Sequence, residues 1–255
     1  MPHLAAVWIY PIKALDGLAI STARMTPAGS LEGDRRFAML DAEGKVINGK
    51  RDPRVHLLRC SFDDDLSTVT LNSEPFRLTA DLKPLEARLS DHFGQAVHLA
   101  ENREAGFPDD TDSPGPTVIS QATLEEVASW FPGLTGQEMR ARVRPNLVVG
   151  GVSAFWEDRL YAGEGQTVPF RIGDVLVQGV NPCQRCVVPP RNPLTGESIP
   201  GFQKTFAERR ERTLPVWAER SRFNHFYRLS VNTRIPESET GKMIKVNDPV
   251  DVMAR

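Results

Sequence analysis

The feature that most constrains this chain is a series of short apolar segments, separated by turn-forming residues, in its first hundred positions. Strands are expected at residues 5–10, 36–41, 45–48, 55–62, 68–71 and 76–79. Closely spaced strands joined by tight turns favour a small barrel or sandwich. One helix is expected over residues 84–93, because Pro84 suits a first helical turn and Gly94 suits the position after the last.

An acidic segment rich in Pro and Gly, residues 101–116, follows these strands and is the best linker in the chain. It predicts a boundary between a first domain at residues 1–100 and a second at residues 101–255. The alternative is a long surface loop within a single domain.

The second half mixes strands with a few helices. Thr123 and Glu126 have the spacing of a capping box and predict a helix that starts there. Helical stretches are expected within residues 202–222, broken at Pro215. Further strands are expected at residues 143–149, 170–180 (two strands around a turn), 227–232, 243–246 and 250–253. Strands predominate, so the predicted fold class is mainly β, of the α+β type.

Composition narrows the class of protein. The 255 residues are 40% hydrophobic and 25% charged, with a formal net charge of -2, which is typical of a globular protein. A dedicated nucleic-acid binder would have a strongly basic face, so no nucleic-acid partner is expected. The start lacks a signal-peptide pattern, and no apolar run approaches the roughly 20 residues that span a bilayer. We therefore expect a cytoplasmic protein with no membrane partner.

The chain contains three cysteines, Cys60, Cys183 and Cys186. Such an odd, small number does not make a disulfide framework. Cys60 lies in an apolar segment and is expected to pack. The other two form a Cys-x-x-Cys pair. Inside a cell, this spacing indicates metal binding or redox chemistry, or it arises by chance.

Four interpretations of the Cys183–Cys186 pair are open. A zinc site needs about four ligands, and neither a second Cys pair nor a short-spaced His pair is present. A thioredoxin-type dithiol sits at a helix N-terminus, and Pro189 and Pro190 disfavour a long helix here. A single metal thiolate on a rigid loop suits a thiophilic metal, with Arg185 placed to lower a thiol pKa. Both cysteines could also be small buried side chains.

Seven blocks in a fixed order go beyond this loop. They are YPIK (10–13), GDRRF (33–37), RPNLVV (144–149), FWED (155–158), RIGD (171–174), CQRC (183–186) and NPLTG (192–196). Together they resemble MOSC-domain proteins with an N-terminal β-barrel domain, a family that includes the mitochondrial amidoxime-reducing component and bacterial relatives. The resemblance covers about Val7 to Val252. It implies a barrel-like domain packed on a MOSC barrel with flanking helices, and a cofactor in the cleft between them.

The resemblance also implies a molybdenum–molybdopterin cofactor whose metal is ligated by Cys186. The phosphate of molybdopterin is a dianion and calls for cations and amide donors. The positions that the resemblance and their neighbourhood indicate for cofactor binding are Lys13, Arg35, Arg51, Ser120, Arg144, Asn146 and Arg185. A pyridoxal phosphate site is not expected.

The implied reaction is reductive removal of oxygen from an N-hydroxylated small molecule. Because this reaction consumes protons, Glu157 or Asp158 is expected to carry them as a catalytic residue beside Cys186. Trp156 either lines the substrate pocket or belongs to the core. Electrons are expected from a separate carrier protein, since the chain has no flavin, haem or iron–sulfur motif. The basic stretch at residues 202–228 is either a docking face for that carrier or a solvated helix face.

Two positions depart from the family pattern, because Pro190 and Asn192 stand where a Thr and an Asp are frequent. Losing a hydroxyl and a carboxylate near the metal changes its supporting hydrogen bonds. A non-catalytic function therefore stays open, in which the protein binds the molybdenum cofactor or carries sulfur as a Cys186 persulfide. A cofactor-free structural or interaction protein is the third alternative.

Overall fold

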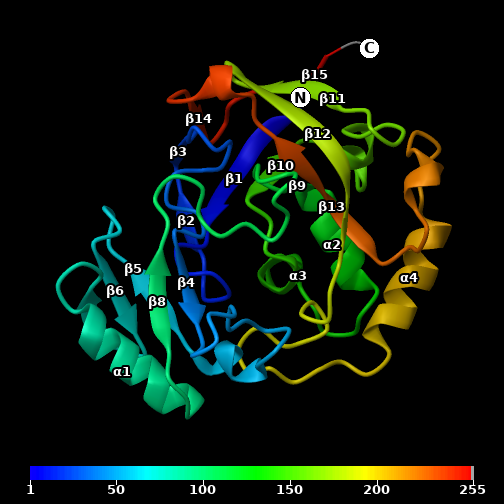
Figure 1. Ribbon diagram of the computed structural model, residues 1–255. Helices are drawn as coiled ribbons and strands as arrows, with labels where there is room; N and C mark the ends of the chain where they lie inside the picture. The colour runs from blue at the N-terminus through cyan, green and yellow to red at the C-terminus, as the bar shows by residue number, and fades with distance from the viewer. Residues whose placement is uncertain (254–255) are drawn as a thin grey trace.

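The computed structural model describes residues 1–253, and its central element there is an eight-stranded mixed sheet (Figure 1). The strand order is β15-β11-β12-β13-β9-β10-β1-β2. The strands are β1 (His3–Ile9), β2 (Leu18–Ile20), β9 (Val118–Ser120), β10 (Leu147–Gly150), β11 (Val168–Ile172), β12 (Val175–Gln184), β13 (Arg228–Arg234) and β15 (Val250–Val252). Only the β9–β10 pair in this order is parallel.

Smaller sheets lie beside this large one. β5 (Cys60–Phe62), β6 (Thr68–Leu71) and β7 (Glu74–Arg77) form an antiparallel meander. β4 (Phe37–Leu40) pairs with β8 (His98–Glu101), and β3 (Thr22–Arg24) pairs with β14 (Met243–Lys245). α1 (Leu82–Phe93) packs on the meander through Leu85 and Leu89. The predicted mainly-β class is confirmed.

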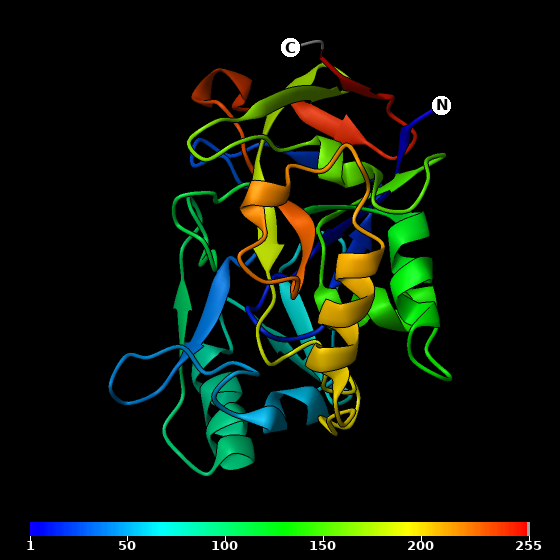
Figure 2. The ribbon, with the colours of Figure 1, turned by 90° about the vertical axis from the view of Figure 1, so that its right-hand side faces the viewer.

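Three further helices cover the large sheet on one side (Figure 2). They are α2 (Gln121–Ser129), α3 (Gly136–Val143) and α4 (Phe202–Arg212). Short 3₁₀ turns are η1 (Pro53–Leu57), η2 (Trp156–Arg159), η3 (Arg220–Arg222) and η4 (Glu237–Glu239). None of the helices within residues 1–253 combines the length and apolar character needed to cross a membrane.

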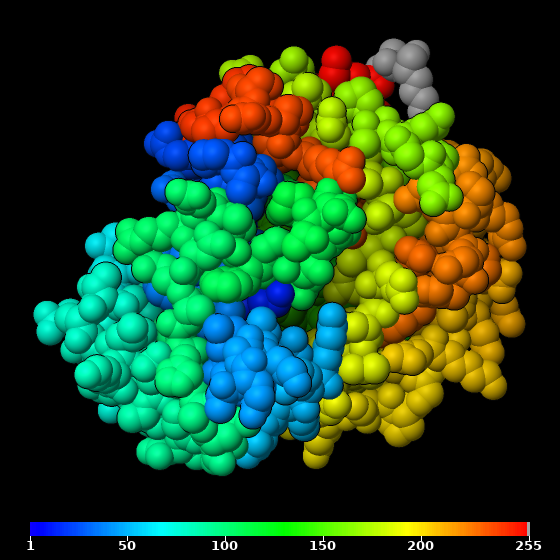
Figure 3. All heavy atoms as spheres, in the orientation of Figure 1, coloured from blue at the N-terminus to red at the C-terminus, as the bar shows by residue number. Residues whose placement is uncertain are grey.

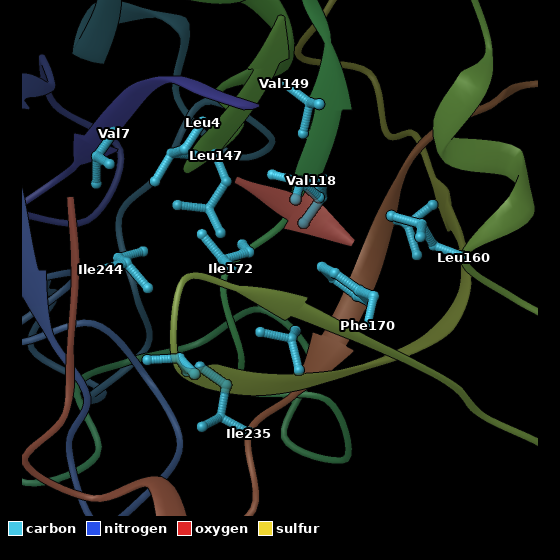
Figure 4. Packing of buried hydrophobic residues seen from close by; sticks show 14 of the residues in the cluster. Leu4, Val7, Val118, Leu147, Val149, Leu160, Phe170, Ile172, Ile235 and Ile244 are labelled. Carbon is cyan, nitrogen blue, oxygen red and sulfur yellow. The ribbon is translucent and has the colours of Figure 1, made fainter. Parts of the chain in front are cut away.

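Buried hydrophobic side chains of residues 1–253 gather in three clusters, and the largest joins the two ends of the chain. In it, Leu4 and Val7 of β1 lie beside Val118 and Leu147 of the second half (Figure 4). β1 pairs with β10 along its length, with a β-bulge between Leu4 and Ala6. The first strand of the chain thus completes the sheet and the core of the second half.

Several local expectations were wrong. Residues 55–62 begin as η1, because the Asp52 carboxylate caps that turn and Pro53 fits its first position. Residues 45–48 do not form a strand. Val46 makes only an isolated β-bridge with Leu40. α3 was not predicted. Ser120 caps α2, three residues before the expected Thr123, and its hydroxyl oxygen accepts from the Thr123 amide at 3.1 Å.

Candidate functional site

A cavity of about 780 Å³ opens between the two halves of the chain. It is the hollow at the centre of Figure 3, bordered there by segments near residue 110 in green, near residue 50 in blue and near residue 190 in yellow. Its walls also include the loop after β1, the end of α3, the end of β12 and part of β13. Segments far apart in sequence therefore meet around one space.

The end of β12 brings the Cys-x-x-Cys pair to this cavity. Cys183 is the second-to-last residue of β12, and Cys186 follows two residues after the strand ends. The β12–β13 pairing shifts register between Pro182 and Gln184, where proline withdraws an amide from the ladder. From Cys186 the chain continues without a helix as far as α4, so neither thiol lies at a helix N-terminus.

Arg185 lies between the two cysteines and is fixed by the neighbouring elements. Its Nη2 donates to the Val143 carbonyl at 2.6 Å, and its Nη1 lies 3.3 Å from the Cys183 sulfur. This contact is a hydrogen bond from the guanidinium to the sulfur. Cys183 and Cys186 are both half-buried free thiols. The geometry therefore offers a cysteine sulfur as a ligand or nucleophile within the cavity.

The end of α3 places two arginines over two aromatic rings of β1 and the residue after it. The guanidinium carbon of Arg140 lies 3.5 Å from the Trp8 ring centroid, and that of Arg144 lies 4.0 Å from the Tyr10 centroid. The four-residue spacing of Arg140 and Arg144 matches the two-residue spacing of Trp8 and Tyr10, because residues four apart in a helix and two apart in a strand share a face. Within residues 1–253, the Arg144 guanidinium makes no hydrogen bond or ion pair.

Arg144 has a backbone φ of 52°, in the left-handed region that is costly for a residue with a side chain. The turn closes α3, and the Arg144 amide donates to the Arg140 carbonyl at 2.8 Å. The Tyr10 hydroxyl donates to the Pro145 carbonyl at 3.1 Å and holds the next residue against β1. This strained turn directs the side chain of Arg144 into the cavity.

A second group of cations comes from the first half of the chain. Lys13 forms an ion pair with Asp109 at 3.0 Å and donates to the Pro108 carbonyl at 3.2 Å. Arg35 pairs with Asp34. Burial alone would raise the pKa of Asp109, but Lys13 and Arg35 outweigh it and bring the pKa below its usual value. These contacts tie residues 108–109 to the loop after β1.

The cavity as a whole is strongly basic. Among residues 1–253, ten Lys and Arg side chains line it against three Asp. The cations are Lys13, Arg35, Lys50, Arg59, Arg140, Arg142, Arg144, Arg185, Arg191 and Arg228. The whole chain has a net charge of -2, so this concentration is local. A water-filled cleft with one sign of charge attracts an anionic ligand.

Several side chains of the cavity wall have one nitrogen without a hydrogen-bond partner within residues 1–253. Within residues 1–253, the buried Nε2 of His56 and the buried Nε atoms of Arg59, Arg185, Arg191 and Arg228 have no hydrogen-bond partner. An unpaired buried donor costs about 1–3 kcal/mol. Acceptor oxygens placed in the cavity would relieve that cost after small side-chain rotations. The donors of Arg185 and Arg228, which lie next to the cysteine loop, therefore fit a thiolate-bound cofactor that carries acceptor oxygens.

The structure brings five of the predicted site residues to the cavity, namely Lys13, Arg35, Arg144, Arg185 and Cys186. The other five do not line it. Arg51 is half-exposed beside the lining residue Lys50, and its Nη2 donates to Asp41 at 2.8 Å.

Ser120 and Asn146 are fully buried and support the backbone near the cavity. The Ser120 hydroxyl caps α2. The Asn146 side-chain oxygen accepts from the Thr117 amide at 3.2 Å, and its nitrogen donates to the Trp8 carbonyl at 3.1 Å. Asn146 thereby connects β1 to Thr117, the residue that precedes β9.

Glu157 and Asp158 lie in η2, in a buried cluster away from the cavity lining. The Asp158 carboxylate pairs with Arg210 at 2.5 Å, and Glu157 accepts from the Thr123 hydroxyl at 3.0 Å. Burial, with a further contribution from Asp158, raises the pKa of Glu157 to about 7. Trp156 packs in the core of the large sheet. These contacts connect η2 to α2 through Thr123 and to α4 through Arg210.

Some lining residues were not predicted as part of the site, among them His56, Arg59, Arg140, Arg191 and Arg228. Arg140 lies four residues before Arg144, so a predicted helix at α3 would have placed both arginines on one face. The others lie on loops and strand ends whose tertiary neighbours set their direction.

Family models match both halves of the chain. The model of the MOSC N-terminal beta barrel domain matches residues 1–138, and the model of the MOSC domain matches residues 116–251. The two matches overlap at residues 116–138, which include β9, α2 and the start of α3. The predicted boundary near residue 101 stays a prediction.

Curated relatives agree with these matches. "Mitochondrial amidoxime reducing component 2" of Bos taurus is 24% identical over 244 residues, covering 76% of this chain and 67% of the relative. "Mitochondrial amidoxime-reducing component 1" of Homo sapiens is 21% identical over 312 aligned positions, covering 99% and 83%. "Molybdenum cofactor sulfurase" of Caenorhabditis briggsae is 21% identical over 254 residues, covering 88% and 34%. The resemblance inferred from the sequence motifs is thus confirmed, and the chain belongs to the MOSC family, with the MOSC N-terminal β-barrel domain and the MOSC domain in succession.

Proposed function

We propose that this protein is a molybdenum-cofactor-dependent oxidoreductase that reduces N-hydroxylated small molecules with electrons from a separate carrier protein. One observation carries the proposal: the half-buried thiol of Cys186 opens into a basic cavity whose buried donors lack acceptors. The relatives named as amidoxime-reducing components support the reaction class.

Each residue has a role in this proposal. The Cys186 thiolate ligates the metal, and Arg185 beside it stabilises negative charge on the cysteine loop. Lys13, Arg35 and Arg144 bind the phosphate, because arginine forks and a lysine ammonium are strong partners for phosphate oxygens. When bound, the cofactor supplies the two-electron redox chemistry that protein side chains lack.

The supporting residues act on this set without touching the ligand. Asn146 holds Trp8 and Thr117 in place, and Ser120 fixes the start of α2. Glu157 and Asp158 do not line the cavity, so we assign them no direct proton transfer to substrate. The carboxylates that do line it are Asp16, Asp109 and Asp110.

A binding or sulfur-carrier function is the second proposal. The match to a molybdenum cofactor sulfurase favours it, as do Pro190 and Asn192. The Asn192 side-chain oxygen accepts from the Leu194 amide at 2.8 Å, and the Pro190 carbonyl accepts from Arg142 at 2.9 Å. Both positions thus shape the loop after Cys186, and neither lines the cavity.

The test is molybdenum content after expression in a host that makes the cofactor. We expect about one molybdenum per wild-type chain, loss in Cys186→Ala, and retention in the matched variant Cys183→Ala. Absence of molybdenum from the wild type, alongside a loaded control protein, would overturn the oxidoreductase proposal and favour the sulfur-carrier or structural alternative. Loaded protein that does not reduce an amidoxime with an artificial electron donor would favour the carrier function.

A further inference from the structure

One wall of the cavity is built where the two halves of the chain meet. The turn η1 carries His56, and the segment after the cysteine loop carries Arg191. Arg59 bridges them, because its Nη2 donates to the His56 carbonyl at 2.7 Å and to the Pro193 carbonyl at 3.1 Å. We call His56, Arg59 and Arg191 the second wall.

The second wall combines a high positive charge with a neutral imidazole. Burial, followed by Arg144, Arg191, Arg59 and Arg142, lowers the pKa of His56 to about 4. His56 is therefore uncharged at neutral pH and can offer an N–H without adding to the repulsion. Asp16 offsets part of the charge by pairing with Arg59 at 3.2 Å.

Each member of the second wall has a buried nitrogen without a partner within residues 1–253. These atoms are His56 Nε2, Arg59 Nε and Arg191 Nε. Arg191 is also weakly held, since its side chain donates to the Gly196 carbonyl at 3.4 Å. Three such groups together cost several kcal/mol unless an acceptor with more than one oxygen reaches them.

The second wall adjoins Arg144, one of the three proposed phosphate-binding residues, and within residues 1–253 it shares no ion pair with the other two, Lys13 and Arg35. Lys13 forms an ion pair with Asp109, and Arg35 forms one with Asp34. His56 is not among the groups that shift the pKa of Asp109. Arg144 is near both groups, because it affects the pKa of His56 and is itself affected by Arg35. A phosphate dianion and one thiolate would leave several of the ten cavity cations unbalanced.

We propose that His56, Arg59 and Arg191 form a second oxyanion-binding site and that its ligand is a carboxylate or phosphate on the substrate. The substrate part rests on the proposed function above. The ligand is then an N-hydroxylated compound with an anionic group at the end remote from its N–O bond. Arg191 can donate two parallel hydrogen bonds through Nε and Nη2, because its hydrogen bond to the Gly196 carbonyl uses Nη1. Arg59 adds one donor, its Nε, because its other nitrogens are held by the protein.

The kinetic test compares an aryl amidoxime with its para-carboxylate derivative on the molybdenum-loaded protein. We expect the carboxylate to have the higher kcat/KM by roughly tenfold to a hundredfold, the range for hydrogen bonds to a charged group. Arg191→Gln should remove this preference mainly by raising KM for the carboxylate, with a smaller change in kcat/KM for the neutral compound, and Arg191→Lys should restore part of the preference. Arg212→Gln is the matched control, since Arg212 is exposed on α4 outside the cavity.

A binding test does not depend on turnover. The same two compounds are titrated calorimetrically into loaded protein without an electron donor. Tighter binding of the carboxylate, lost in Arg191→Gln and kept in Arg212→Gln, supports the second site even if neither compound is reduced, in which case the proposed function alone fails. Equal binding of the two compounds would overturn the second site.

The oxyanion could also belong to the cofactor, and the cofactor's mass separates the two sources. Extracted cofactor with a single phosphate, retained equally by wild type and Arg191→Gln, supports a substrate anion. Cofactor that carries a second phosphate and is lost from Arg191→Gln would assign the wall to the cofactor and overturn the substrate class.

Discussion

At the scale of single residues, Glu157 is a carboxyl group enclosed by protein behind the large sheet, 1% exposed. Its pKa of about 7 in the fold lies above the unfolded value of 4.5. The folded state therefore binds more protons between these two values, and stability must fall as pH rises through that window. The loss amounts to at most about 3 kcal/mol.

We predict that Glu157→Gln is more stable than the wild type at pH 8 and that the difference shrinks towards pH 4.5. Glutamine keeps the volume and can still accept from the Thr123 hydroxyl. Urea unfolding at several pH values measures the effect, with Glu164→Gln as a control in an exposed turn. Equal pH slopes in the wild type and Glu157→Gln would contradict the assignment.

Cys60 also lines the cavity, yet its chemistry differs from that of the cysteine loop. Burial, with Asp16 adding to it, raises the pKa of its thiol to about 12. Because only the thiolate is nucleophilic, Cys60 should be alkylated at pH 8 at least a hundredfold more slowly than a free cysteine. Iodoacetamide labelling with peptide mapping checks this, and Cys60→Ser identifies the peptide. Rapid labelling of Cys60 in the folded protein would show that the thiol is not shielded.

The residues of the site divide by how they could be predicted. Lys13, Arg35, Arg144 and Cys186 stand in motifs whose order identified the family, and the structure gathers them around one cavity. His56 and Arg191 stand in no such motif, because their role depends on which loop of the other half they meet. A single sequence does not show which loops of the two halves contact each other.

At the scale of elements, local signals predicted what local forces determine. α1 ends at Gly94, which has a left-handed φ of 59°, as the sequence predicted. α3 was missed because its eight residues, GQEMRARV, are mostly polar and show no apolar stripe. At residues 55–62 an apolar run suggested a strand, but the Asp52–Pro53 start of η1 prevailed over it.

β12 is the element that carries the cysteines, and its path depends on Gly179. A Cβ added there would lie 1.7 Å from the Leu160 carbonyl oxygen, which is backbone and cannot rotate away. We predict that Gly179→Ala destabilises the protein by about 3 kcal/mol or more and lowers molybdenum retention, since β12 must shift. Thermal unfolding and metal content measure both effects.

Gly163→Ala is the matched control for this strand. It makes the same chemical change, and its nearest neighbour would be a flexible Gln166 side-chain atom at 3.4 Å. We expect its melting temperature to stay within a few degrees of the wild type. A Gly179→Ala protein that is equally stable would show that β12 does not pack so closely on Leu160.

At the scale of the whole molecule, the two halves share one sheet. β1 and β2 come from the first hundred residues, yet they lie at one edge of the sheet that the second half builds. The sequence showed that residues 5–10 form a strand but not that its partner is β10, about 140 positions later. Pairing over such a distance is determined by the shape of the common core, not by any local pattern.

This shared sheet predicts how the chain behaves when it is cut. A protease site inserted at the exposed turn of Arg103 and Glu104 should be cleaved without separating the pieces, because Leu4, Val7 and Ile9 remain in the large core cluster. The nicked protein should co-elute on gel filtration and come apart only in denaturant, whereas residues 101–255 expressed alone should lack a cooperative unfolding transition. The uncut insertion protein is the control for the inserted residues. If the two pieces separate under native conditions and each keeps a folded spectrum, the boundary near residue 101 is structural and β1 is dispensable to the second half.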